Sequence, residues 1–382
     1  MTASAVVMTR LGLAALYFSR FLLTAVPAQL YLAALFLCRP RAPRPLVWYA
    51  VTCGAFVVTT VVLGRSLVPL RNAAFYFSFL TPLLAMCAVR RGAARFTAQN
   101  GFVIAVCVAT LVEALLINTP LGADVWFFPA DHPHRNLIFG AGWYQRPSGL
   151  TGIASSTAFI VVFSLILADV FDRNWRLLSA RNVLATVTLT VLAAGTGFVL
   201  FILYLITKVP IRALAGKRPH LVSRLSVIAV VLILLYGATG NLWTNELNKF
   251  SFTYVWLIIE NKMAMIRELH VPAVQQLLLG GQVSRAAPVL NTASDFGYFG
   301  MFHAMGLIGC ALVLSAPLVF FRAIPSLAVP TAFVYLSFVH YPSLSSPPGA
   351  VLFAFYLFML HDHTVASRRA VVEPAAALPA TA

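Results

Sequence analysis

Apolar residues run along this chain in long blocks, and most charged residues lie in the gaps between the blocks. About 20 mainly apolar residues are enough to cross a bilayer as a helix. The spans predicted in this way are 18–37, 46–63, 72–89, 101–118, 150–170, 222–240, 295–321, 326–341 and 348–361. The pattern predicts an all-α polytopic membrane protein, with one helical domain over 1–363 and a disordered tail over 364–382.

The apolar segment 181–210 is long for a single span and has basic clusters on both flanks. One crossing would place one cluster outside, although Lys and Arg favour the cytoplasmic side. Two short helices that turn between Ala194 and Gly197 keep both clusters inside, and Gly195 and Gly197 allow a tight turn. We therefore predict a hairpin here and about 11 transmembrane helices in all, within a range of about 10–12.

The distribution of charge sets the predicted orientation. Most of the 27 lysines and arginines fall in the gaps placed inside, which favours an outside N-terminus and a cytoplasmic C-terminus. Arg10 and Arg20 oppose this, because two short initial helices would move the N-terminus inside. The net charge of +16 is attributed to basic collars that face anionic membrane lipid, and it gives no indication of nucleic acid.

Two long loops are predicted on the outside, about 118–149 and 241–294. Long loops are usually functional or disordered, and the many aromatic residues in these two argue against disorder. Trp and Tyr suit the membrane interface, and they also stack on sugar rings. Within the second loop, 253–270 has the periodicity of an amphipathic helix lying in the outer interface.

The loops contain arginines that suit an anionic substrate. Arg135 and Arg146 lie in the first loop and Arg285 in the second. Guanidinium groups stay charged and match phosphate oxygens, so together they could hold a pyrophosphate without a metal. Pairing with nearby acids is the alternative. Asp131, His132 and His134 are the nearest approach to a metal motif, but Pro133 separates the histidines, and we predict neither a metal nor a cofactor.

Two acidic residues are candidates for proton transfer. Asp295 begins a membrane helix close to the loop arginines, where it would serve as a general base or as a helix cap. Glu113 lies within a predicted span, where a carboxylate indicates function or a buried partner for an arginine. His270 and His303 are weaker candidates for the base, and packing within the bundle is the more typical role for His303.

Three segments then resemble one family in their order. They are "WYQRPSGLTGIASSTAFIVVF" (143–163), "LAAGTGFVLFILYL" in the hairpin, and "QLLLGGQVSRAAPVLNTASDFGYFGMFHAMGLIG" (276–309). The first resembles an Arg-x-x-Gly loop leading into a helix, and the last a loop that ends in an Asp-x-x-Tyr helix start. This series resembles bacterial polysaccharide polymerases of the Wzy type and the related O-antigen ligases, over roughly residues 100–320.

The resemblance implies a GT-C-like membrane glycosyltransferase in the bacterial inner membrane. Its donor would be an oligosaccharide repeat unit on undecaprenyl diphosphate, joined at the periplasmic face to a growing polysaccharide. Asp295 would be the catalytic base, Arg146, Arg135 and Arg285 would hold the diphosphate, and Tyr298 would contact the substrate. A flippase and proteins of chain-length control or export would be partners in the same pathway.

One departure and two alternatives qualify this expectation. The ligases have a His-Asn pair where this chain has Ser294 and Asp295, which favours an exopolysaccharide polymerase over a ligase. A flippase or other transporter is the alternative from another class. Such proteins often contain internal repeats and broken helices at the membrane midplane, whereas the polar residues here gather in the outside loops.

Overall fold

The computed structural model describes most of the helical part of the chain. The described residues are 3–19, 22–38, 42–64, 67–89, 101–119, 147–170, 179–208, 274–280, 297–319, 328–339 and 342–372, together with Thr253, Trp256 and Glu260. The predicted span 222–240 and most of both predicted loops lie outside them. Of the predicted helix 253–270, the three single residues are helical and exposed.

The described residues form thirteen α-helices and one short 3₁₀ helix. They are α1 (Ala3–Tyr17), α2 (Leu22–Cys38), α3 (Arg44–Gly64), α4 (Val68–Tyr76), α5 (Leu80–Val89), α7 (Gly101–Ile117), α9 (Ala154–Asp169), α10 (Ala180–Leu192), α11 (Gly195–Lys208), α15 (Val274–Leu279), α17 (Gly297–Val319), α18 (Ala328–Leu336), η3 (Ser343–Ser345) and α19 (Pro347–Val372). The all-helical prediction is confirmed for this part of the chain.

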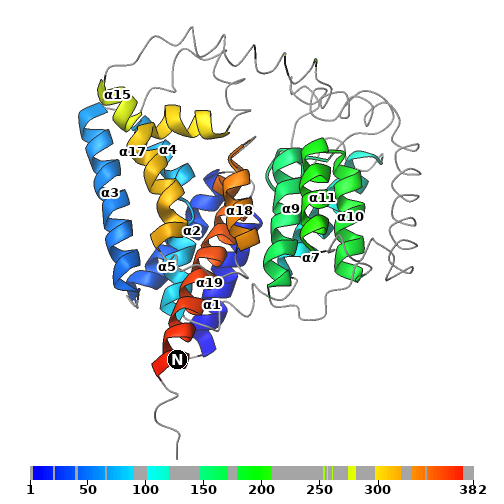
Figure 1. Cartoon of the computed structure of the whole chain (residues 1–382), viewed down its shortest axis with the longest axis horizontal. Coiled ribbons are helices and arrows are strands. Elements are labelled where there is room, and N and C mark those ends of the chain that lie inside the picture. The colour runs from blue at the N-terminus through cyan, green and yellow to red at the C-terminus, as the bar shows by residue number, and fades with distance from the viewer. Residues whose placement is uncertain are drawn as a thin grey trace, which may run out of the picture.

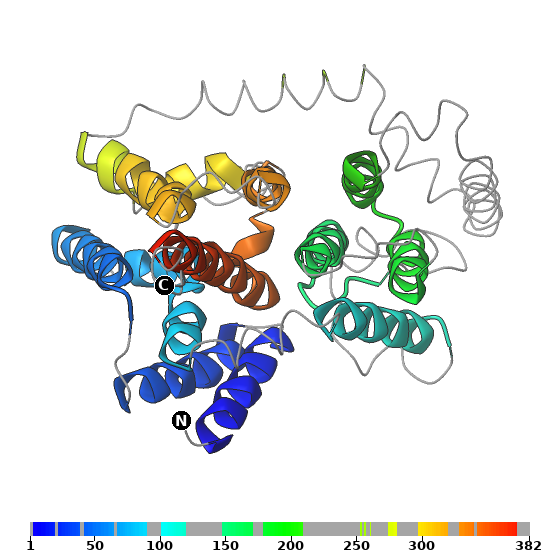
Figure 2. The same ribbon diagram turned by 60° about the horizontal axis from the view of Figure 1, so that its bottom comes forward.

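The helices form two groups that meet at α9 (Figures 1 and 2). Helices α7, α10 and α11 pack on one side of α9, while α18, α19 and η3 contact it from the other group. All side chains from Ser156 to Asp169 are buried, and so are all from Ala350 to Leu360 in α19. A helix that is apolar on every side belongs in the interior, which explains why α9 and α19 form the centre.

The outer helices instead leave apolar faces exposed. On α3, Trp48, Val58 and Val62 have exposed fractions of 70%, 63% and 66%. On α7, Ile104, Val108, Val112 and Leu115 follow one another at helical spacing and are all exposed. By length and composition, two described helices are long and apolar enough to cross a membrane, Arg44–Gly64 and Gly300–Val319. The number of spans, about 11, stays a prediction.

The predicted helix pair within 181–210 is confirmed as α10 and α11, both packed on α9. The residue that makes the turn differs from the prediction. Ala193 takes the left-handed conformation, with φ 45°, and its N–H donates to the carbonyl of Thr190 at 3.0 Å. Gly197 serves packing instead, since a Cβ there would lie 2.5 Å from Cβ of Ala158 on α9.

The structure adds one helix before a predicted span and divides another span in two. The predicted span 18–37 corresponds to α2, and α1 precedes it as a separate helix with Leu13, Leu16 and Tyr17 buried. The hydroxyl of Tyr17 donates to the carbonyl of Phe102 at 2.9 Å, which ties α1 to α7. The predicted span 72–89 is interrupted between α4 and α5, where the ring of Phe79 packs against that of Phe353.

Helix α17 is broken at Gly306, whose φ of 64° and ψ of −174° are not helical. Helix α15 lies across the break: a Cβ on Gly306 would be 2.5 Å from the backbone of Leu278, and one on Gly280 would be 2.5 Å from the nitrogen of Gly306. A helix break leaves carbonyls without their usual donors. One nearby carbonyl, that of Ala304, accepts from the side-chain amide of Asn72 on α4 at 3.1 Å.

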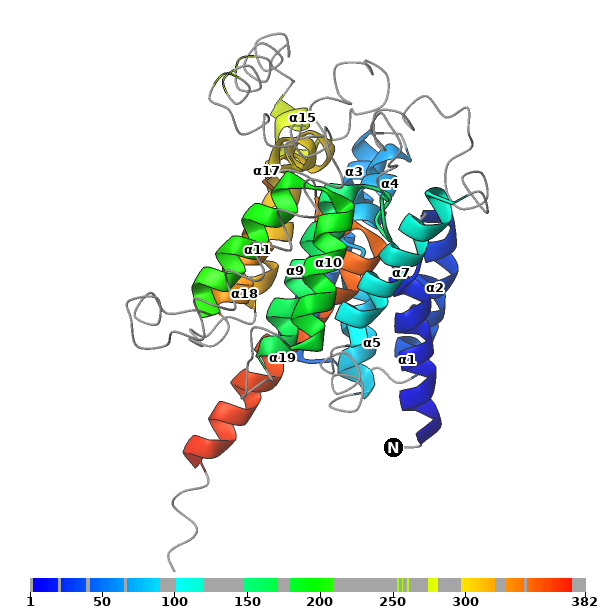
Figure 3. The same cartoon turned by 90° about the vertical axis from the view of Figure 1, so that its right-hand side faces the viewer.

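The last helix is longer than the predicted span 348–361. Helix α19 continues to Val372, into the segment predicted as a disordered tail, and residues 373–382 lie outside the described part. The N-terminus and the far end of α19 lie at the same end of the bundle (Figure 3), so the prediction that placed the N-terminus outside and the C-terminus on the cytoplasmic side was wrong in placing them on opposite sides. We call this end of the bundle the inner end, and the end where α7 finishes and α17 begins the outer end.

Candidate functional site

A buried carboxylate lies near the outer end of α7. Glu113 is 1% exposed. Its Oε1 accepts from the hydroxyl of Ser148 at 2.9 Å and from the N–H of Ser148 at 3.4 Å, and its Oε2 accepts from the N–H of Gly149 at 2.5 Å. Buried charge is tolerated when hydrogen bonds satisfy it. Glu113 therefore fixes the loop that leads into α9, which we call the α9 loop (residues 147–153).

The α9 loop needs this support because its backbone is not helical. Gly149 has a φ of +69°, a conformation that other residues rarely adopt. A Cβ at Gly149 would lie 2.3 Å from Cγ2 of Thr157, so the loop packs directly on the first turn of α9. The hydroxyl of Thr157 donates to the carbonyl of Ser148 at 2.6 Å. The loop is thus held from both sides, by Glu113 on α7 and by Thr157 on α9.

The turn before α19 reaches the same part of α9. The hydroxyl of Ser343 in η3 donates to that of Ser156 at 3.2 Å, and both side chains are buried. Close approach is possible here because Gly349 has no side chain; a Cβ would lie 2.1 Å from the carbonyl oxygen of Ser343. Small residues therefore bring α19 against the start of α9.

Most of the predicted site residues lie outside the described part of the chain. These are Asp295, Arg146, Arg135 and Arg285, together with the predicted non-ligands Asp131, His132 and His134 and the weaker base candidate His270. Two of them border described elements in sequence: Arg146 directly precedes Pro147 of the α9 loop, and Asp295 stands two positions before Gly297, the first residue of α17.

Tyr298, the predicted substrate contact, lies within the described part of the chain. It is half-buried on the first turn of α17, and its hydroxyl donates to the carbonyl of Tyr335 at 2.7 Å. Its N–H donates to the carbonyl of Phe338 at 2.8 Å. Tyr298 thus joins the start of α17 to the end of α18. His303, on the same helix, is half-buried beside the ring of Phe302.

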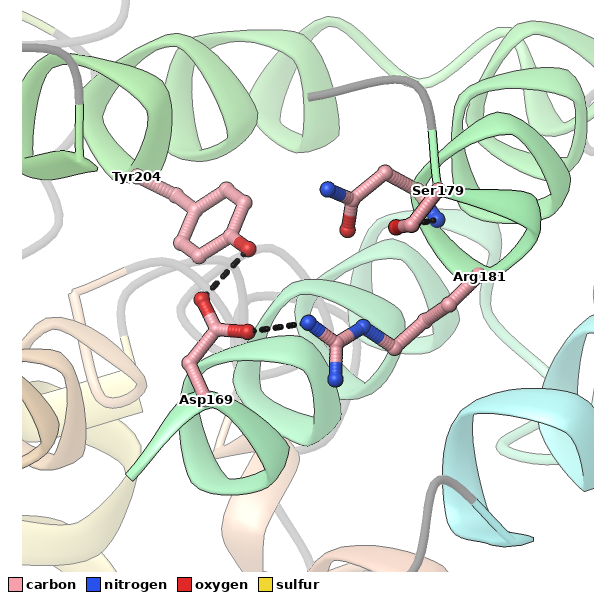
Figure 4. Close-up of polar contacts among 5 residues, drawn as sticks. Asp169, Ser179, Arg181 and Tyr204 are labelled. Carbon is pink, nitrogen blue, oxygen red and sulfur yellow. Dashed lines mark hydrogen bonds and ion pairs between the residues drawn. The ribbon is translucent and has the colours of Figure 1, made fainter. Parts of the chain in front are cut away.

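A second buried carboxylate lies at the inner end of α9 (Figure 4). Oδ1 of Asp169 accepts from Nη2 of Arg181 at 2.5 Å, and Oδ2 accepts from the hydroxyl of Tyr204 at 2.6 Å. The three side chains come from α9, α10 and α11, and we call them the inner triad. Ser179 begins α10 by accepting from the N–H of Asn182 at 3.3 Å, which places Arg181 in its first turn.

Sequence reasoning missed the roles of both carboxylates. Arg181 belongs to the basic cluster that precedes the predicted helix pair and was expected to stay in the cytoplasm, yet it is 8% exposed and paired with Asp169. An acid at the end of one apolar helix, followed by an arginine at the start of the next, was the available signal. No comparable signal joined Glu113 to Ser148, which is 35 positions away.

Within the described residues, no three His, Cys, Asp or Glu side chains gather as a metal site would require. What the outer end presents is a buried carboxylate that holds a non-helical loop between two helices. Comparison of the chain with protein-family models, with curated proteins and with solved structures finds no match.

Proposed function

We propose that this chain is a membrane glycosyltransferase that polymerises oligosaccharide repeat units carried on undecaprenyl diphosphate. The reaction would take place at the periplasmic face of the bacterial inner membrane and produce an exopolysaccharide. The proposal begins from the order of sequence segments that resemble Wzy-type polymerases. The observation that carries it in the structure is the α9 loop, a fixed non-helical segment that directly follows Arg146.

The distribution of apolar surface supports a membrane location. Helices α3 and α7 expose valine, leucine and isoleucine along whole faces, whereas the one carboxylate of α7, that of Glu113, is buried and hydrogen-bonded. Water-soluble proteins rarely expose apolar patches of this extent. In lipid the same faces need no cover, because hydrocarbon surrounds them.

The arrangement of helix ends supports one outward-facing site. The end of α7, helix α15 and the first turns of α17 lie at the outer end of the bundle (Figures 1 and 3). The predicted periplasmic loop 118–149 follows the end of α7, and the predicted loop 241–294 contains α15 and leads into α17. Arg146 and Asp295, which border α9 and α17 in sequence, would therefore both belong to the periplasmic side.

The chemistry assigns a role to each candidate residue. A hydroxyl of the acceptor sugar attacks the anomeric carbon of the donor, and the bond from that carbon to the diphosphate oxygen breaks. The hydroxyl proton passes to Asp295, while undecaprenyl diphosphate leaves with its negative charge. Arg146, with Arg135 and Arg285, would stabilise that charge without a metal. Tyr298 would contact the glycan from the start of α17.

The decisive experiment is deletion of the gene, followed by analysis of polymer size and of lipid-linked intermediates. A polymerase predicts loss of long polymer and accumulation of single lipid-linked repeat units at the periplasmic face. Units trapped on the cytoplasmic face would instead identify a flippase, the alternative favoured by the broken helix α17. Accumulated full-length polymer that lacks its final acceptor would indicate a ligase.

Two variants then test the assigned residues in the complemented strain. Asp295→Asn and Arg146→Ala should each abolish polymer while leaving normal amounts of folded protein in the membrane, because they remove the base and a diphosphate contact. If Asp295→Asn keeps full activity, Asp295 caps α17 and the base lies elsewhere.

A further inference from the structure

Among the described residues, three donors to Glu113 come from two adjacent residues of the α9 loop. They are the N–H and hydroxyl of Ser148 and the N–H of Gly149. Both carboxylate oxygens are used, so the position of the loop is defined along two directions. A single hydrogen bond would leave the loop free to pivot, whereas contacts to both oxygens restrict it.

Glu113 is poorly placed to stabilise its own helix. It lies near the C-terminal end of α7, where the helix dipole disfavours a negative charge. Its donors come instead from a segment 35 and 36 positions further along the chain. The carboxylate therefore acts on the α9 loop, and α7 serves as the rigid element that carries it.

Arg146 directly precedes this anchored loop in the sequence. Pro147 separates Ser148 from Arg146, and the ring of proline fixes one backbone dihedral angle of the connection. The backbone position of Ser148 therefore limits where the chain at Arg146 can begin. A small displacement of a binding group is enough to weaken its contact with a substrate.

We infer that Glu113 is a positioning residue for the diphosphate site, because it holds the loop from which Arg146 extends. The inference rests on the proposed function, in which Arg146 binds the diphosphate of the donor. It adds a residue that does not contact substrate, and it assigns the same indirect role to Thr157, which holds the loop from α9 through the carbonyl of Ser148.

The chain supplies a matched control at the other end of α9. Asp169 is also a buried carboxylate that uses both oxygens, but its donors are the side chains of Arg181 and Tyr204. It lies at the end of the helix opposite the α9 loop. Replacing either carboxylate by its amide disturbs buried hydrogen bonds, and only the change at Glu113 releases the loop.

The experiment compares Glu113→Gln and Asp169→Asn with wild type, in the purified full-length protein reconstituted in lipid. Polymerisation of a polyprenyl-diphosphate-linked repeat unit is measured per folded molecule, and KM for this donor is separated from kcat. Hydrogen exchange of the 148–152 amides is followed in the same samples. We expect Glu113→Gln to raise the donor KM at least roughly tenfold and to speed exchange in the loop, while Asp169→Asn leaves both unchanged.

The outcomes separate this inference from the proposed function. If wild type neither binds nor polymerises the donor, the proposed function fails and the inference fails with it. If wild type is active and Glu113→Gln keeps the wild-type KM, or shifts it by the same factor as Asp169→Asn, only the inference is overturned. If Glu113→Gln does not fold, Thr157→Val decides: a raised donor KM supports the positioning role, and an unchanged KM overturns it.

Discussion

Helix α9 is held at its two ends by buried carboxylates that differ in what they hold. At the inner end, Asp169 joins the side chains of Arg181 and Tyr204, which come from two further helices. At the outer end, Glu113 binds the backbone of a non-helical loop. The inner triad connects regular elements whose backbone is already satisfied, whereas the outer contact determines the course of backbone that has no helix to follow.

Asp169 is therefore expected to contribute mainly to the stability of the bundle, and Glu113 mainly to the placement of the α9 loop. Helices α9, α10 and α11 would keep their hydrogen bonds without the triad, but they would lose the neutralisation of a buried charge. The α9 loop loses its shape without Glu113, and little of the bundle core depends on it. Each variant below therefore has one expected effect on stability and a separate one on donor binding.

The largest effect on stability is expected from Asp169→Ala. The change leaves Arg181 inside the bundle without the carboxylate that balances its charge, and breaking a buried pair in this way costs about 3–5 kcal/mol. Unfolding in detergent, followed by tryptophan fluorescence, measures the loss. The folded fraction should retain the wild-type donor KM, and a raised KM would show that the inner end also shapes the site.

Gly149→Ala should lower the free energy of unfolding less than Asp169→Ala does, but it should impair donor binding more. The left-handed conformation and the contact with Thr157 oppose a side chain at this position, for a cost of about 2–3 kcal/mol. Because the loop must shift, the donor KM should rise even in folded protein. Gly54→Ala on α3 is the control, since nothing lies within 4 Å of the added Cβ; similar behaviour of the two variants would remove the case for a tightly fixed loop.

The smallest effects come from a matched pair of hydroxyl deletions, Tyr204→Phe and Thr157→Val. Tyr204→Phe removes the hydrogen bond to Asp169, whereas Thr157→Val removes the hydrogen bond to Ser148 and those with Thr151; each bond lost lowers the free energy of unfolding by about 1 kcal/mol. A raised donor KM for Thr157→Val alone would sharpen the contrast between the two ends. A raised KM in both variants would erase it.

Much of the helical framework was predictable because apolar length and basic flanks are local signals. They identified α3, α7, α9 and the pair α10 and α11 close to their observed bounds. Whether the first apolar segment forms one helix or two stayed open, since α1 is short and contains Arg10 within its apolar run. The interruption between α4 and α5 has an equally weak signal, because every residue from Phe77 to Phe79 suits a buried helix.

The candidate site was predictable only in part, because side-chain pairing across the bundle leaves no periodic trace. Glu113 was recognised as unusual within an apolar span, but whether it served function or met an arginine stayed open. Its contact with Ser148 and Gly149 depends on how α7 packs beside α9. The roles of Asp295, Arg146, Arg135 and Arg285 stay predictions, and Tyr298 has a structural contact that the sequence did not indicate.

The contact between Asn72 and the broken helix α17 has a consequence for biosynthesis. The amide of Asn72 and the carbonyl of Ala304 are 232 positions apart, so the ribosome must complete more than half of the chain between them. The bend at Gly306 also packs closely against the backbone of Leu278 and Gly280. All three of these partners precede Gly306 in the chain, so the contact of Asn72 cannot form until α17 has been synthesised, and assembly of the outer end must be a late step of folding.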